Sequence, residues 1–112
     1  MANDELINLV SKELDIKHGI TENLIKTLLE VVIPDFDKKQ DVYTTDNINE
    51  TGEIGLQTRI GDRLAEIKKY LSLDKNAREE LLLTDQKITN DFLNIGIFGL
   101  IGYIYRNNNW KE

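Results

Sequence analysis

The chain has 112 residues, enough for one domain, and 40% of them are hydrophobic, which can support one compact core. Its 20 acidic and 14 basic residues give a net charge of −6, which argues against a protein held mainly by nucleic-acid phosphates or by an anionic membrane surface. The absence of cysteine excludes disulfides and thiolate metal sites.

Apolar residues at helical spacing predict two helices in the first third of the chain. The first spans about residues 4–18, with Asp4 at the positive helix N-terminus and Gly19 as its stop. Thr21 is expected to cap the second helix, and Pro34, the only proline, to end it. A connection of about two residues would make the pair an antiparallel or angled hairpin.

The helical pattern breaks over residues 35–52, where Asp, Asn, Thr and Lys dominate. A long polar excursion, or a loop carrying a short hairpin, is expected there. Residues 53–60 alternate as a strand would, but their apolar spacing also fits a helix, so both interpretations stay open. A helix is expected over residues 62–71, and Ser72 or Asp74 can cap the next one.

The end of the chain holds the strongest local signal. Residues 92–105 contain ten large apolar residues, three glycines and one polar residue. This is short of the roughly 20 residues of a bilayer span, so a buried core helix is expected, with a strand as its rival. Gly96, Gly99 and Gly102 recur every third residue. Since a glycine costs roughly 1 kcal/mol in a helix, we expect close packing there against a backbone of this chain or of a neighbouring copy.

These elements together predict a mainly α fold. We expect one helical domain over residues 1–112, a small bundle of four to five helices with room for one short β-hairpin in the middle segment. The polar excursion at about 35–52 and a C-terminal tail, residues 106–112, would lie outside the bundle.

No pattern in the sequence predicts catalytic, cofactor-binding or metal-binding residues, and we expect no enzyme and no cofactor. His18, the only histidine, has no second nitrogen ligand and no thiolate to join it, so a position near the negative end of a helix is the simpler interpretation. The late glycines lack the Lys-Ser/Thr of a phosphate-binding loop. The tail holds residue types that anchor protein interfaces, so we predict partner binding, with closure of the core as the alternative, for Tyr103, Tyr105, Arg106 and Trp110.

Two segments of the chain, taken together, resemble a known family. One is Leu9-Val-Ser-Lys-Glu-Leu-Asp-Ile16, followed by Thr21-Glu-Asn-Leu-Ile-Lys-Thr-Leu-Leu-Glu-Val-Val-Ile33. The other is the apolar stretch from Asn90 to Asn109, with its aromatic and charged stop at Tyr105-Arg106-Asn107. This order of a short Leu/Ile helix, a Leu/Ile-rich helix and a late apolar helix resembles the small head–tail connector (adaptor) proteins of tailed bacteriophages.

The resemblance implies a ring-forming virion protein made in the host bacterial cytoplasm. The ring would lie beneath the portal and line the DNA channel, and the partners would be further copies and neighbouring portal or tail-completion proteins. DNA would pass through without specific binding, and an acidic channel would let it slide. The tail, residues 106–112, would be an arm toward the portal. The acidic N-terminus lacks the basic region of a secretory signal, which agrees with cytoplasmic synthesis and no membrane.

Two other classes of function stay open. A small acidic helical protein suits an immunity protein or inhibitor that covers a basic partner, to which charge would steer it. Residues 92–105 with Trp110 also suit a peripheral membrane protein with an interfacial aromatic anchor. A connector predicts a ring-sized particle, an inhibitor predicts a monomer or dimer with one basic partner, and a membrane protein predicts pelleting with lipid.

Overall fold

The computed structural model describes residues 3–41, 45–84 and 86–111. These ranges are mainly helical and contain no strand, which confirms the α class and leaves the middle segment without the hairpin within those ranges. The contacts divide the chain into two compact units, Met1–Tyr43 and Thr44–Glu112, and one helical domain over residues 1–112 stays a prediction.

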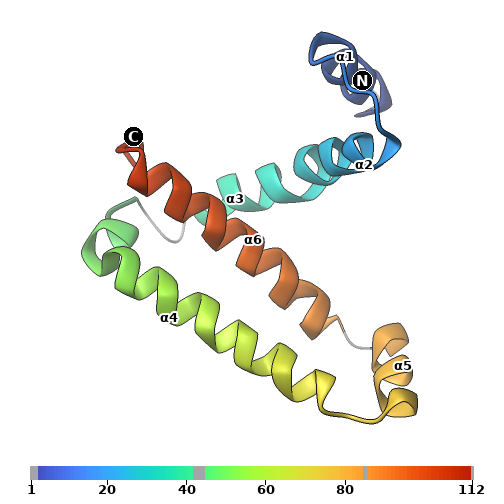
Figure 1. Ribbon diagram of the computed structural model, residues 1–112. Coiled ribbons are helices and arrows are strands. Elements are labelled where there is room, and N and C mark those ends of the chain that lie inside the picture. Colours follow the sequence, from blue (N-terminus) through green and yellow to red (C-terminus); the bar gives the residue numbers. More distant parts are fainter. Residues whose placement is uncertain (1–2, 42–44, 85, 112) are drawn as a thin grey trace. The chain divides into compact units, whose positions relative to one another are not determined.

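The first unit begins with α1 (Asn3–Glu13), which packs on α2 (Gly19–Thr27) (Figure 1). α1 ends in a Schellman motif because Asp15 adopts a left-handed backbone, with φ of 53°. The Asp15 N–H donates to the Lys12 carbonyl at 3.1 Å, and the Ile16 N–H donates to the Ser11 carbonyl at 2.9 Å. The first helix therefore stops at Glu13, well before the predicted end.

Gly19 begins the second helix and does not stop the first. His18, whose backbone is extended at φ −119° and ψ 132°, is the N-cap residue, and its carbonyl accepts the Thr21 N–H at 3.0 Å. The predictions of Gly19 as a stop and of Thr21 as a cap are therefore wrong. The left-handed residue that ends α1 is an aspartate, which reaches this conformation more readily than most other residues.

Pro34 lies inside a continuous helical run, so the prediction that it ends the second helix is wrong. α2 leads into a π-helical segment, η1 (Leu28–Val32), and α3 (Ile33–Lys39) follows directly. Proline has no N–H to donate, and its ring crowds the carbonyl four residues back. Just before the proline the Ile33 N–H donates to the Leu28 carbonyl, five residues back, and this wider turn accommodates the ring.

The second unit is built on an antiparallel pair of helices, α4 (Thr45–Leu71) and α6 (Lys87–Arg106), which α5 (Lys75–Thr84) connects (Figure 1). Their register is set by interactions that run from Arg106 with Glu53 to Asp91 with Glu66, and Gly102 lies beside Leu56 between them. The core of the unit lies along this seam, and its buried apolar residues are Ile48, Leu56, Ile67, Ile97 and Ile101.

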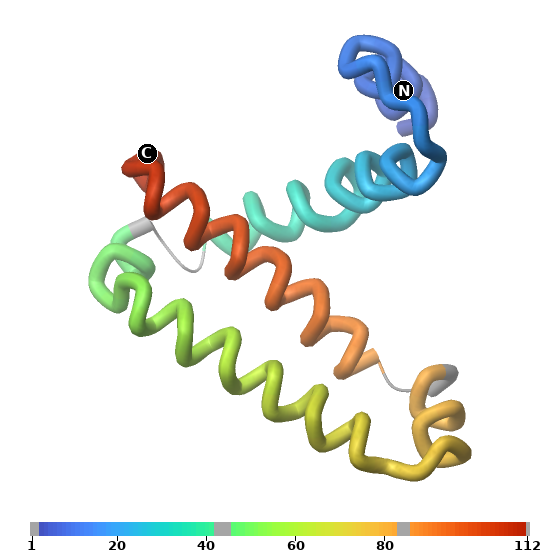
Figure 2. Tube along the Cα trace, in the orientation of Figure 1, coloured from blue at the N-terminus to red at the C-terminus, as the bar shows by residue number. Residues whose placement is uncertain are grey.

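α4 is two helices joined at Gly52, whose backbone is not helical (φ 60°, ψ −154°). Arg59 donates to the side-chain oxygen of Asn47 at 2.9 Å. Twelve residues of straight helix would separate these two by about 18 Å, so the chain must reverse between them. Figure 2 shows this sharp bend near the start of α4.

Most of the expected polar excursion is helical. α3 extends to Lys39 and α4 begins at Thr45, so the expectation of a long irregular segment is wrong for the described residues of 35–52; residues 42–44 lie outside them. Ile48 explains the difference, because burying its side chain stabilises the helix formed by the surrounding polar residues. Residues 53–60 are helical, which decides between the two interpretations of that segment.

α5 follows a cap that the sequence predicted, whereas α6 begins five residues before the apolar stretch of residues 92–105. Asp74, one of the two predicted caps, accepts the Ala77 N–H at 2.9 Å ahead of α5. α6 confirms the helix over the strand, and it ends in a second Schellman motif at Asn108 (φ 60°), where the Asn109 N–H donates to the Ile104 carbonyl at 3.0 Å. In the described part of the chain, no helix combines the length and apolar content of a transmembrane span.

Candidate interaction surface

α6 has one face buried against α4 and an exposed apolar face. Asp91, Ile97 and Ile101 are buried, while the exposed residues recur at steps of three and four, which places them on one side of a helix. No charged residue occurs between Asp91 and Arg106. The exposed face, here called the α6 stripe, consists of Phe92, Gly96, Gly99, Leu100 and Tyr103.

The glycines of the α6 stripe are open. A methyl group added at Gly96 or Gly99 would meet no atom within 4 Å. One added at Gly102, which lies outside the stripe, would meet only Leu56 Cδ1, at an ordinary van der Waals distance of 3.8 Å. Among the described residues of the second unit, nothing therefore packs closely on Gly96 or Gly99. The prediction that a neighbouring copy approaches them stays a prediction.

The four predicted partner-binding residues separate into two kinds. The Tyr105 hydroxyl lies 3.7 Å from where a Cβ would stand on Gly52, and Arg106 Nη1 lies 3.0 Å from Glu53 Oε1, so both side chains face α4. Trp110 is half-buried, whereas Tyr103 is 72% exposed. Tyr103 is therefore the member of the set that extends the α6 stripe, while Tyr105 and Arg106 help to join the two helices.

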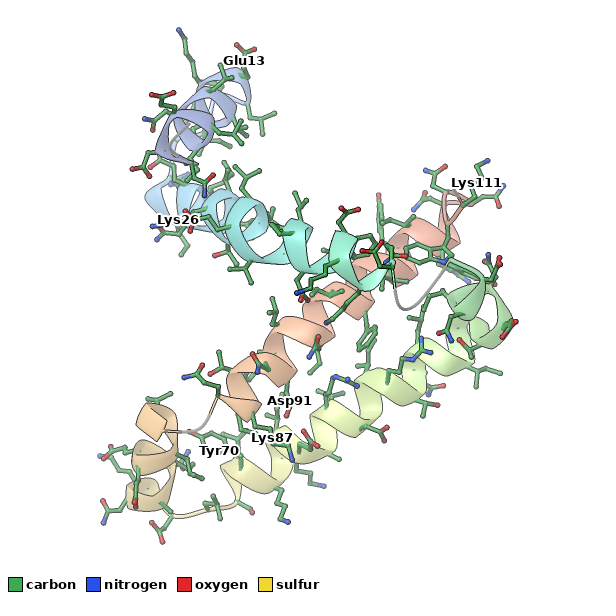
Figure 3. The ribbon with its side chains drawn as sticks, turned by 180° about the vertical axis from the view of Figure 1, so that it is seen from behind. Glu13, Lys26, Tyr70, Lys87, Asp91 and Lys111 are labelled. Atoms are coloured by element: carbon green, nitrogen blue, oxygen red, sulfur yellow. The ribbon has the colours of Figure 1, made fainter. Side chains whose placement is uncertain are left out.

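The sequence analysis missed a set of charged side chains between α4 and α6. Arg63 and Arg59 lie over the Phe98 ring, with their guanidinium carbons 4.8 and 5.9 Å from its centroid. Lys87 Nζ lies 3.4 Å from Glu66 Oε1, and in Figure 3 the side chains of Lys87 and Asp91 project from α6 toward α4. The helical spacing of residues 59, 63 and 66 was the available signal, because it places them on one face.

Asp91 is the buried member of this set, with 6% of its surface exposed. As an ionised carboxylate it would leave Oδ2 buried with no hydrogen-bond donor. Burial raises the pKa of Asp91, and a hydrogen bond to the neighbouring Glu66 carboxylate raises it further. The same bond, more than the nearby Lys87 ammonium, lowers the pKa of Glu66. Of the two carboxyl groups, Asp91 is therefore the one whose protonated form the fold favours.

The Asp91→Asn variant is expected to be more stable than the parent protein at pH values where Asp91 is ionised, by about 1–3 kcal/mol, because a neutral amide replaces a buried carboxylate whose Oδ2 lacks a donor. A raised pKa means that Asp91 favours the folded state while protonated, and this contribution is lost as pH rises from 3.8 through the raised pKa. The advantage of the variant should therefore be small below pH 3.8 and should grow above it.

Urea unfolding at a series of pH values, followed by the fluorescence of Trp110, the only tryptophan, measures this difference in the second unit. Asp62→Asn, at an exposed position of the same helix pair, is the control and should show no such growth. A stability difference between Asp91→Asn and the parent that stays constant with pH would contradict the assignment of the proton.

Among the residues that the structure describes, no three His, Cys, Asp or Glu side chains are grouped to hold a metal ion. Comparisons of the chain with protein-family models, curated proteins and solved structures found no match. The exposed apolar face of α6 is therefore the feature on which a function can be proposed.

Proposed function

We propose that this protein is a structural subunit of a phage neck, a head–tail connector that forms a ring beneath the portal and lines the DNA channel. The observation that carries the proposal is the large apolar surface that a single copy leaves in contact with water. Such surface is typical of a protein that is completed by association with other macromolecules.

The exposed apolar residues occur in both units. In the first unit the large ones are Leu9, Leu14, Ile20, Leu24, Val31 and Ile33, and in the second they include Ile54, Leu64, Phe92, Leu100 and Tyr103. In a ring every subunit has two neighbours, so faces of both units can be covered at once. Helices of adjacent copies would then pack on these exposed faces.

The charge of the chain suits a DNA channel. A net charge of −6 per copy, multiplied around a ring, repels the phosphates of the passing DNA and prevents sticking. Neighbouring portal or tail-completion proteins would bind the two rims of the ring, and the tail, residues 106–112, is the proposed arm toward the portal. The virion is then the place of action, after synthesis in the bacterial cytoplasm.

Sedimentation velocity and negative-stain electron microscopy of the purified protein test the function. We expect ring-shaped particles of one size that persist in high salt, because apolar burial rather than charge holds them together. Tyr103→Ala should weaken the assembly, while Gln57→Ala, at an exposed polar position of α4, should leave it unchanged.

Other outcomes point to other functions. A protein that stays monomeric or dimeric and binds one basic partner would instead be an inhibitor or immunity protein. A protein that sediments with lipid vesicles would be a peripheral membrane protein. Turnover of a small molecule by the purified protein would contradict all three structural roles.

A further inference from the structure

We infer that the α6 stripe of one copy receives the exposed face of α2 from the next copy, so that subunits join head to tail. This inference rests on the proposed ring and names the two surfaces that build it. Each surface is on the same chain, and each is exposed in a single copy.

The face of α2 that fits carries large residues. Ile20 is 75% and Leu24 55% exposed, Thr27 follows three residues later, and Val31 is exposed in η1 beyond it. Steps of four and three residues place Ile20, Leu24 and Thr27 along one side of the helix. Ile20 and Leu24 contact water over most of their surface, so burying them against a partner is favourable.

The α6 stripe has the complementary shape. Its first steps of four and three residues match those of the α2 face, but Gly96 and Gly99 stand at its middle, between the large Phe92 and Tyr103. Because nothing lies within 4 Å of a Cβ at either glycine, the stripe is open where the α2 face is bulky. Ridges of side chains on one helix pack into grooves on another in this way.

The distribution of charge along the chain favours contact between the α2 face and the α6 stripe. Each copy carries a net charge of −6, so two copies repel one another wherever acidic surfaces would meet. The α6 stripe lies in a stretch without charged residues from Phe92 to Tyr105, and the three positions of the α2 face are also uncharged. Apolar, uncharged faces are where copies of an acidic chain can approach most closely.

Symmetry distinguishes this pairing from its main rival. If the α6 stripes of two copies met each other, the contact would close a dimer, would place glycine against glycine, and would leave α2 uncovered. Pairing α2 with α6 is heterologous, so each subunit keeps one free face of each kind and the chain of subunits can close into a ring.

Single-cysteine variants test the pairing, since the natural chain contains no cysteine. Leu24→Cys and Leu100→Cys, mixed in equal amounts and oxidised, should give a disulfide between the two different variants, which a tag on one of them identifies by mass. A chain that carries both substitutions should give a ladder of covalent oligomers. Gln57→Cys mixed with Leu24→Cys is the control and should give little product.

Two cross-linking results would overturn the inference. Efficient disulfide formation by Leu100→Cys alone would show that two α6 stripes meet. A disulfide within one chain of the double variant, without any ladder, would show that α2 covers α6 of its own copy.

Gly99→Leu provides a second, independent measurement. The added side chain finds open space in a single copy, so circular dichroism should show unchanged helicity, while the dissociation constant of the assembly should rise at least tenfold. Gly61→Leu, at another open and exposed glycine, should leave assembly unchanged. Rings that form with unchanged affinity in Gly99→Leu would refute the pairing but not the ring, whereas a parent protein that never assembles would refute the ring itself.

Discussion

Gly52→Ala is expected to lower the free energy of unfolding of the second unit by about 1–3 kcal/mol, because the backbone at this position is accessible essentially only to glycine. Its φ of 60° and ψ of −154° reverse the chain inside α4. The reversal brings Asn47 onto Arg59 and buries Ile48, so an alanine there must either strain the backbone or release both contacts.

Gly61→Ala is the matched control, since Gly61 is an exposed glycine within the regular part of α4 and a Cβ there meets nothing within 4 Å. This substitution should raise stability by up to about 1 kcal/mol, because alanine is the better helix former. Urea unfolding followed by Trp110 fluorescence measures both variants. Equal effects of the two substitutions would show that Gly52 is not held in its special conformation.

The sequence predicted which segments are helical more reliably than it predicted where each helix begins and ends. The apolar spacing located the helices, and Asp74 was correctly proposed as a cap. The stop of the first helix was misplaced because glycine is the usual left-handed residue, whereas Asp15 takes that conformation here, as Asn108 does at the end of α6. A local pattern cannot choose between a glycine and a nearby aspartate when both can end a helix.

Tertiary contacts outweighed local signals in the middle of the chain. Pro34 and the polar run after it both argued against helix, yet α3 includes the proline and α4 begins at Thr45. The π-helical turn before Pro34 and the burial of Ile48 supply what the local sequence lacks. Neither is visible in a single sequence, because one depends on backbone geometry and the other on a distant partner.

The candidate surface was foreseen in its residue types but not in its geometry. The sequence singled out Tyr103 and the late glycines, but only the register of α6 on α4 shows that Gly96, Gly99 and Tyr103 share the exposed face while Tyr105 turns toward Gly52. The Glu66–Asp91 pair was missed because its members are far apart in the sequence and meet only across the helix pair.

Ile101→Ala should lower the free energy of unfolding of the second unit by about 2–5 kcal/mol, since it removes most of a buried aliphatic side chain and leaves a cavity. Ile101 is 5% exposed and belongs to a small core, in which no described side chain is completely enclosed. Because small domains are only marginally stable, a loss of this size should leave much of the unit unfolded at room temperature, as circular dichroism and Trp110 fluorescence would record.

Leu100→Ala removes a similar side chain from the preceding position of the same helix, where the leucine is 48% exposed. We expect it to change the stability of a dilute single copy by less than about 1 kcal/mol, because most of the leucine surface already contacts water. In the proposed assembly the same substitution should weaken association, since Leu100 lies in the α6 stripe. One residue would thus hold the helix pair together while its neighbour holds copies together. A reversal of these two effects would mean that α6 packs on α4 with the opposite face.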